Sequence, residues 1–231
     1  MQLESKVTTY EKIKPLFFNG MRLLYGGFGG VGTPPGLVDC LIESGVSGVH
    51  LIGNDAGFPN VGMGKFIVLG RATSLIASHI GSNPVAGELM TKGLLQVEFL
   101  PQGIFVERIR CGGVGLHGFL TDVAIGTPLA EGKKIIEIDG NELLYQPAIR
   151  GDVSIVYARK ADYFGNLVFD KTARNTNPVV AMAGKITIVE ADEIVPPGTI
   201  DPDQVMLPGI YVQHIVPSKG YNWKWIWETQ E

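Results

Sequence analysis

One short segment of the chain concentrates glycines that could bring the backbone close to a bound ligand. The segment Gly26–Pro34 reads GGFGGVGTP, and its glycines satisfy the spacing G-x-G-x-x-G that is typical of dinucleotide-binding loops. Asp55 follows about 20 residues later, where such loops place the acidic residue that binds the ribose. One interpretation is therefore an NAD(P)-binding oxidoreductase.

Two features of the surrounding sequence argue against this interpretation. Pro34 and Pro35 open the following helix, and neither supplies the N–H group that a bound pyrophosphate would use. Asp55 lies in the turn Asn54–Gly57, beyond the end of a predicted strand rather than at it. The spacing also occurs by chance or in turns that need glycine for steric reasons, so the motif alone leaves both interpretations open.

The cysteines and histidines show no pattern typical of a metal site. Cys40 and Cys111 form no C-x-x-C motif and no cluster with histidine, which predicts reduced thiols and no metal. His79 and His117 each stand alone, as structural histidines usually do, although either has the chemistry of an acid or base.

The elements that position the glycine segment follow the pattern strand, helix, strand. The apolar run Met21–Tyr25 predicts a strand, and Thr33 is expected to be the N-cap of a helix that starts at Pro34. Gly45 ends that helix, and Val49–Ile52 predicts the next strand. Such a unit is the basis of a parallel sheet covered by helices.

The rest of the chain continues this alternation, with one antiparallel insertion. The expected strands are Leu75–Ser78, Gln96–Leu100, Val153–Ala158 and Lys185–Val189; the expected helices are Pro84–Thr91, Ile104–Arg110 and Pro178–Ala183; a hairpin is expected over Lys134–Tyr145 around Asp139-Gly140-Asn141. The predicted fold class is α/β: a single domain with a mostly parallel central sheet flanked by helices and additional antiparallel strands. This domain is assigned to residues 1–217, and no internal repeat is recognised.

The last residues, 218–231, form a predicted aromatic tail. Trp223, Trp225 and Trp227 alternate and would share one face of a strand. A contact with another subunit and a terminal strand that packs on its own domain explain this pattern equally well.

Composition excludes several classes of protein. The chain has 231 residues and a net charge of −4, and it has no basic cluster longer than Lys133-Lys134, so no nucleic-acid binding is expected. No apolar run approaches the ~20 residues that span a bilayer. Met1–Lys14 lacks the apolar core of a signal peptide, and a cytoplasmic protein without membrane contact is predicted.

The glycine segment and its flanks resemble the A-subunit signature of the family I CoA-transferases. The residues that carry the resemblance are Asn19-Gly20, Leu23-Leu24-Tyr25, Gly26-Gly27-Phe28, Gly32 and Pro34, and Tyr25 departs from the aliphatic residue usual there. Further family-like stretches are Asn54-Asp55, ASHIGSNP (Ala77–Pro84), LPQG (Leu100–Gly103), ERIRCGG (Glu107–Gly113), GFLT (Gly118–Thr121), KAD-x-x-GNL (Lys160–Leu167), RN-x-NP (Arg174–Pro178) and PGIYVQHIV (Pro208–Val216).

The resemblance implies the A subunit of a heteromeric 3-oxoacid CoA-transferase. Such enzymes move CoA between a short-chain acyl-CoA and a carboxylate such as acetoacetate, acetate or butyrate, by ping-pong chemistry through a glutamyl-CoA thioester. The nucleophilic Glu lies in a Ser-Glu-Asn-Gly segment of the B subunit, and this chain has no such segment. No catalytic residue is therefore assigned here, and Glu107 beside Arg108 is interpreted as a solvated or paired charge. Coenzyme A is a substrate, and no cofactor is expected.

By the same resemblance, the chain contributes the wall of the substrate pocket. Gln102 is the first candidate, because its amide can hydrogen-bond a carboxylate or a 3-oxo group without adding charge; a turn residue bonded to the backbone is the alternative. Asn54 has the same chemistry, whereas Asp55 is expected to serve a turn or a helix cap. The remaining candidates are the loop residues whose backbone would approach the pocket: Gly26, Gly27, Phe28, Gly29 and Gly30. A ligand-binding or regulatory module without enzymatic activity remains a further alternative, and it would bind its ligand without a partner.

Overall fold

The structure, a computed structural model, describes residues 4–220, so the three tryptophans of the predicted tail lie outside the described residues. A seven-strand path forms the centre of the molecule, in the order β11-β10-β8-β1-β2-β3-β4, with all neighbours parallel. The strands are β1 (Arg22–Tyr25), β2 (Val49–Ile52), β3 (Ala72–Ala77), β4 (Gln96–Phe99), β8 (Gly151–Asp162), β10 (Gly184–Val195) and β11 (His214–Pro217); the short β9 (Leu167–Val168) pairs antiparallel with β8.

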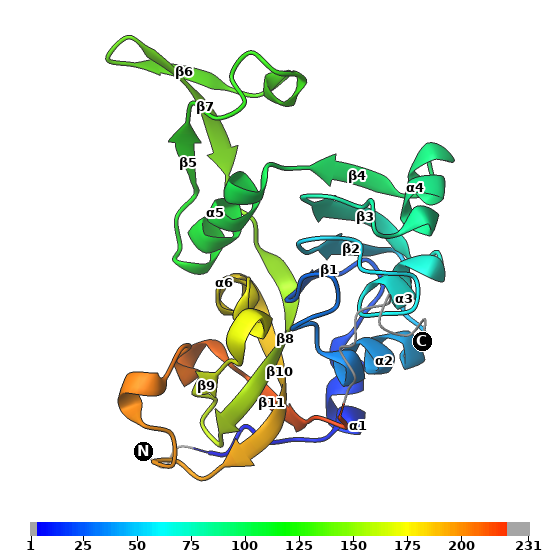
Figure 1. Ribbon diagram of the computed structural model, residues 1–231, viewed down its shortest axis with the longest axis vertical. Coiled ribbons are helices and arrows are strands. Elements are labelled where there is room, and N and C mark those ends of the chain that lie inside the picture. Colours follow the sequence, from blue (N-terminus) through cyan, green and yellow to red (C-terminus); the bar gives the residue numbers. More distant parts are fainter. Residues whose placement is uncertain (1–3, 221–231) are drawn as a thin grey trace.

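Helices cover both faces of this sheet (Figure 1). On one side lie α2 (Pro35–Glu43), α3 (Gly64–Val68) and α4 (Pro84–Thr91), and on the other lie α5 (Gln102–Gly113) and α6 (Asn177–Ala183). The short α1 (Tyr10–Ile13) precedes β1. Single 3-10 turns occur at η1 (Lys14–Leu16), η2 (Pro128–Ala130), η3 (Lys171–Arg174), η4 (Pro202–Gln204) and η5 (Gly209–Tyr211).

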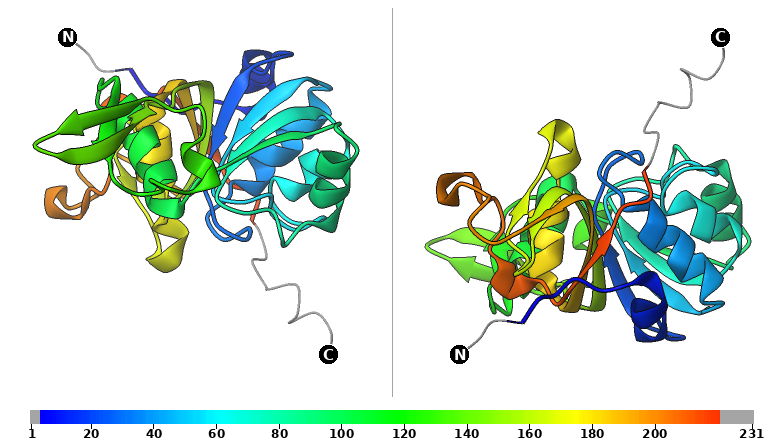
Figure 2. Two further views of the ribbon diagram at one scale, coloured as in Figure 1. Left: turned by 90° about the horizontal axis from the view of Figure 1, so that it is seen from above. Right: turned by 90° about the horizontal axis from the view of Figure 1, so that it is seen from below.

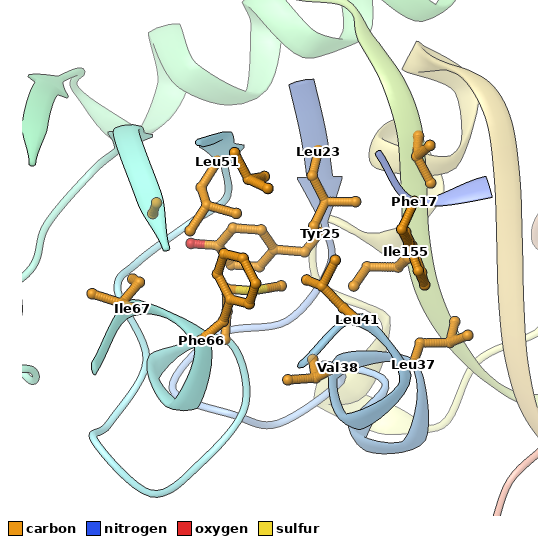
Figure 3. Close-up of a cluster of buried hydrophobic side chains, with 14 of the residues drawn as sticks. Phe17, Leu23, Tyr25, Leu37, Val38, Leu41, Leu51, Phe66, Ile67 and Ile155 are labelled. Atoms are coloured by element: carbon orange, nitrogen blue, oxygen red, sulfur yellow. The ribbon is translucent and has the colours of Figure 1, made fainter. Parts of the chain in front are cut away.

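Each face of the sheet has its own hydrophobic core. Alternate residues of β1 point to opposite faces, so Leu23 and Tyr25 pack beneath α2 and α3, whereas Leu24 packs with residues of α5. In the first core the Tyr25 ring lies among aliphatic side chains and Phe66 (Figure 3). Because both faces are covered, the strands are mainly apolar, as expected for parallel strands.

A separate antiparallel sheet projects from one end of the molecule (Figure 1; Figure 2 gives two further views). It consists of β5 (Gly118–Thr121), β6 (Ile135–Ile138) and β7 (Asn141–Pro147), in the order β5-β7-β6. This confirms the hairpin predicted around Asp139-Gly140-Asn141. The α/β fold class is confirmed as well, and α4 has the bounds that the sequence predicts.

The predicted cap of α2 is wrong. The helix begins at Pro35 with Pro34 at the N-cap position, and no side chain caps it; the Thr33 hydroxyl instead donates to the carbonyl oxygen of Gly26 at 3.0 Å. Gly27 makes this contact possible: its φ is +111°, and a Cβ there would lie 1.9 Å from the Thr33 Oγ1 atom. The hydroxyl therefore closes the glycine loop and not the helix end.

The structure shows a local repeat that the sequence analysis did not recognise. The loop after β1 contains Gly-Phe-Gly-Gly-Val-Gly (27–32), and the loop after β2 contains Gly-Phe-Pro-Asn-Val-Gly (57–62). In each loop the phenylalanine and the valine pair across a tight turn. Within residues 4–220, no helix combines the length and the hydropathy needed to cross a membrane.

Candidate functional site

The candidate site lies at the carboxyl ends of β1 and β2, beside the middle of β8, where the sheet order changes direction. From β1 the chain builds the sheet outward through β2, β3 and β4, and it later adds β8, β10 and β11 on the other side of β1. Ligands of open parallel sheets bind at such switch points, because the loops there diverge and leave a crevice. A cavity of about 390 Å³ is found here, lined by Phe28, Asn54, Gln102, Val106, Arg174, Asn175, Thr176, Pro178 and Val179.

Hydrogen bonds fix the orientation of the two amide side chains in this cavity. Asn54, which is 1% exposed, donates through Nδ2 to the carbonyl oxygen of Gly27 at 2.8 Å and to Thr176 Oγ1 at 3.0 Å. Since a carbonyl oxygen only accepts, Nδ2 must face it, and Asn54 Oδ1 then accepts from Gln102 Nε2 at 2.6 Å. Both Asn54 amide protons are thus donated within the chain, whereas Gln102 keeps one N–H and its oxygen for another partner.

The structure therefore brings Gln102, Asn54 and Phe28 together at one cavity. Gln102 is the first residue of α5, and its amide bonds the Asn54 side chain rather than the backbone. Val106 comes from the next turn of α5, while Pro178 and Val179 belong to α6. The lining thus combines apolar side chains with polar groups; substrate binding by Gln102 and Asn54 stays a prediction.

The glycines of the loop do not line the cavity, and the N–H groups of Gly26, Gly27 and Gly29 are bonded within the protein. Gly27 N–H donates to Asn175 Oδ1 at 3.0 Å, and Gly29 N–H donates to Asp55 Oδ2 at 2.9 Å. Gly26 N–H donates to the carbonyl oxygen of Ile155 on β8. Only the Phe28 side chain, 46% exposed, reaches the cavity from this loop, and its ring lies 5.9 Å from the His79 ring.

Asp55 is a turn residue, as predicted, and not a ligand for a ribose. Its carboxylate is 3% exposed and accepts from Gly57 N–H at 2.6 Å as well as from Gly29 N–H. The Tyr25 hydroxyl donates to the Asp55 carbonyl oxygen at 2.5 Å. Burial, with the nearby Asp55 charge, raises the pKa of the Tyr25 hydroxyl well above its usual value, so the phenol stays a neutral donor. With Asp55 and the loop amides engaged, the dinucleotide interpretation is not favoured.

Sequence analysis assigned no role to Arg174, which the structure places in the cavity. Arg174 ends η3 and is exposed, and its neighbour Asn175 has the unusual φ of +21°. Asn175 holds this conformation through Nδ2, which donates to the carbonyl oxygens of Val31 and Thr172, both at 3.1 Å. The signal in the sequence was the RN-x-NP stretch, which the resemblance quoted without a function.

Two acidic residues near α5, Glu98 and Glu107, form ion pairs, which agrees with the interpretation of Glu107 as a paired charge. Glu107 pairs with Arg110, and this holds the pKa of the Glu107 carboxyl below its ordinary value. Glu98 pairs with Arg108 at 2.6 Å. In the described part of the chain, no group of three or more histidines, cysteines or acidic residues is arranged to hold a metal ion.

Comparisons with known proteins identify the family of this chain. The coenzyme A transferase family matches residues 7–218. A probable coenzyme A transferase subunit alpha from Bacillus subtilis is 51% identical over 91% of this chain and 92% of its own length. The acetate CoA-transferase subunit alpha of Escherichia coli is 43% identical over 94% of this chain and 99% of its own length.

Among solved structures, an acyl-CoA transferase from Escherichia coli O157:H7 superposes with a TM-score of 0.84 at 20% identity. The match covers 95% of this chain and 48% of that protein, so this chain spans about half its length. At this identity the likeness supports the fold alone. The curated relatives are matched over nearly their whole length, however, and with the family match they show that this chain belongs to the coenzyme A transferases, beside their alpha subunits.

Proposed function

We propose that this chain is the A subunit of a heteromeric, short-chain CoA-transferase that works with a B subunit. The enzyme would move CoA between a short-chain acyl-CoA and a carboxylate such as acetoacetate, acetate or butyrate, in two half-reactions. In the first, a Glu carboxylate of the B subunit attacks the thioester carbonyl and forms an acyl-glutamyl anhydride as CoA thiolate leaves; the thiolate then attacks the glutamyl carbonyl, which releases the donor carboxylate and leaves a glutamyl-CoA thioester. In the second, the acceptor carboxylate reverses these steps and leaves as its acyl-CoA, which frees the Glu. Splitting one difficult exchange into two easier ones is the advantage of nucleophilic catalysis.

The observation that carries the proposal is the Gln102 amide at the cavity, in a chain of this family. Asn54 Oδ1 accepts a hydrogen bond from one N–H of the Gln102 amide, so the second N–H is available to an oxygen of the substrate. Val106, Pro178 and Val179 offer an apolar surface to a short aliphatic chain. The name of the Escherichia coli relative, an acetate CoA-transferase subunit, supports a small carboxylate as the acceptor.

The B subunit supplies what this chain lacks. By resemblance it holds the catalytic carboxylate, and we expect it to bind most of the CoA nucleotide, because this chain has a net charge of −4 and no basic cluster to receive phosphates. Binding energy from that remote nucleotide can then lower the barrier at the thioester. Coenzyme A is a substrate, and we propose that no metal or redox cofactor takes part.

We also propose a cytoplasmic location for the complex. The two cysteines, Cys40 and Cys111, are free and buried, which fits a reducing compartment.

The test is reconstitution. This chain is purified, mixed with the B subunit of the same organism, and assayed with acetyl-CoA and acetoacetate for acetoacetyl-CoA, with each chain alone as a control. Activity in the mixture only is the expected result. A stable complex that is inactive with all three carboxylates would overturn the proposed substrates, and saturable ligand binding by this chain alone without transfer would favour a binding module instead.

A further inference from the structure

Arg174 differs from every other arginine of the chain in having no hydrogen-bond or ion-pair partner within residues 4–220. The other arginines each donate to a carboxylate or a carbonyl oxygen of the protein. Among the described residues, nothing accepts a hydrogen bond from the Arg174 guanidinium, although this residue lines the candidate cavity. Its donors therefore remain available to a ligand.

The backbone that carries Arg174 is held firmly against the glycine loop. On one side, the Ala173 carbonyl oxygen accepts from Asn177 Nδ2 at 2.8 Å, and the same amide donates to the Gly32 carbonyl oxygen at 2.9 Å. On the other side, Asn175 is bonded to both Gly27 and Val31. A residue whose neighbours are tied down at both sides loses less backbone entropy when its side chain binds a ligand.

The charge of the cavity is complementary to a monocarboxylate. None of its lining residues is acidic, and Arg174 is its one cationic side chain within the described part of the chain. A guanidinium matches the geometry of a carboxylate and can donate two parallel hydrogen bonds to it. The Gln102 amide and the apolar side chains lie in the same cavity, where they can receive a 3-oxo group and a short aliphatic tail.

We propose that Arg174 is a substrate-binding residue that recognises the carboxylate of the acceptor. This inference rests on the proposed function, since it assigns the charge-recognising group of that same cavity. No covalent step is ascribed to Arg174. It orients the acceptor and raises its occupancy, and the chemistry takes place on the partner subunit.

The test compares Arg174→Gln with Arg174→Lys in the complex with the B subunit. We expect Arg174→Gln to raise the KM for the carboxylate acceptor at least tenfold, while the KM for the acyl-CoA donor changes less than twofold. Arg174→Lys keeps the charge and loses the paired donors, so its KM for the acceptor should lie between those of the wild type and Arg174→Gln. Lys171→Gln is the matched control: it removes a positive charge from the same η3 turn, outside the cavity lining, and should leave both constants unchanged.

A second readout separates this inference from the proposed function. Binding of butyrate to the wild-type complex and to Arg174→Gln is followed by ligand-detected NMR, which needs no turnover. Weaker butyrate binding in Arg174→Gln supports the inference even if the complex transfers no CoA, an outcome that would overturn only the proposed function. An unchanged acceptor KM in an active complex, or unchanged butyrate binding, overturns the role of Arg174. If Arg174→Gln fails to assemble, as judged by gel filtration, the same comparison is decided by Arg174→Lys.

Discussion

The loops after β1 and β2 each contain a hairpin with the pattern Gly-Phe-x-x-Val-Gly, at residues 27–32 and 57–62, yet only the first hairpin reaches the candidate cavity. In the first loop the two central residues, Gly29 and Gly30, have φ values of +57° and +95°, as in the mirror-image turns of tight hairpins. In the second loop these positions are Pro59 and Asn60, and the proline ring holds φ at about −65°. The two turns therefore differ in hand.

This difference places the two phenylalanines in different environments. Phe28 is 46% exposed and lines the cavity, whereas Phe58 is only partly exposed and does not line it. The loops also touch each other, because a Cβ on Gly30 would lie 2.5 Å from the Val61 side chain. The first hairpin thus presents a side chain to the site, and the second packs against the first.

The last glycine of each loop gives the largest expected contrast. Gly32 has a φ of +81°, and a Cβ there would lie 2.4 Å from the Ala173 carbonyl oxygen; Gly62 has a φ of +58°, and its nearest atom would be 3.4 Å away. We expect Gly32→Ala to lower the free energy of unfolding by more than about 3 kcal/mol, because backbone strain and a clash add. Gly62→Ala should lower it by about 1 kcal/mol, from strain alone.

Urea unfolding of the purified chain, followed by circular dichroism, measures both values. Equal losses for the two variants would mean that contact with residues 173–177 adds nothing to the stability of the first loop.

A buried carboxyl group from β10 contacts α2, the helix that follows the first loop. Glu190 of β10 accepts from Leu37 N–H of α2 at 2.9 Å and from the Ser218 hydroxyl at 3.1 Å, and it is fully buried. Burial raises the pKa of the Glu190 carboxyl from 4.5 to about 7, only partly offset by these hydrogen bonds. The folded state then holds a proton that the unfolded state releases, so this group lowers stability as pH rises from about 4.5 through about 7.

We expect this component of stability to amount to about 3.5 kcal/mol at most, at about 1.4 kcal/mol for each pH unit between the two pKa values of the Glu190 carboxyl. Glu190→Gln keeps the shape and removes the titration, so its free energy of unfolding should lose less between pH 5 and pH 8 than that of the wild type. Urea unfolding at the two pH values tests this, and parallel losses in both proteins would contradict it.

Phe58 should matter more for stability, and Phe28 should matter more for activity. Phe58→Ala removes a partly buried ring and should cost about 2 kcal/mol of unfolding free energy, with little direct effect on the acceptor KM. Phe28→Ala removes an exposed ring and should cost less than about 1 kcal/mol. It should raise the acceptor KM, however, because it opens one wall of the cavity. If Phe28→Ala lost more unfolding free energy than Phe58→Ala, the assignment of Phe28 to the site and of Phe58 to structural support would be wrong.

Gln102→Ala should have the smallest effect on stability and a clear one on activity. Because Gln102 is exposed, water in the cavity can take the place of its amide at Asn54 Oδ1, and we expect the free energy of unfolding to change by less than about 0.5 kcal/mol. The value of kcat/KM for the acceptor should fall about tenfold, equal to one lost hydrogen bond of about 1.4 kcal/mol. Steady-state kinetics of the reconstituted complex measure it, and wild-type kinetics would exclude Gln102 from substrate binding.

The sequence alone determined much of this protein, because the relevant signals are local. Apolar runs and glycines predicted β1, β2 and the sheet around them, and the turn Asn54–Gly57 predicted the role of Asp55. The order of short motifs along the chain predicted the family. The prediction of a helix cap at Thr33 was wrong, because a threonine that caps a helix and one that closes the preceding loop cannot be distinguished in the sequence.

Only the tertiary structure decided which groups meet at the site. Asn175 and Gly27 are 148 positions apart, and the pairing of β8 with β1 brings them together. Local periodicity holds no information about such a contact, so the sequence could not show that Asn175 and Asn177 fix the glycine loop. Nor could it show that Arg174 lies beside this loop with no partner among the residues that the structure describes. The carbonyl oxygen of Gly27 accepts from Asn54 Nδ2 and so fixes the orientation of the Asn54 amide. Asn54 Oδ1 then accepts from one N–H of Gln102, and the second N–H of Gln102 remains available. The sequence determined which side chains can donate or accept hydrogen bonds. Which of these donors and acceptors remain free to bind a ligand was decided by the neighbours that each side chain meets in the folded structure.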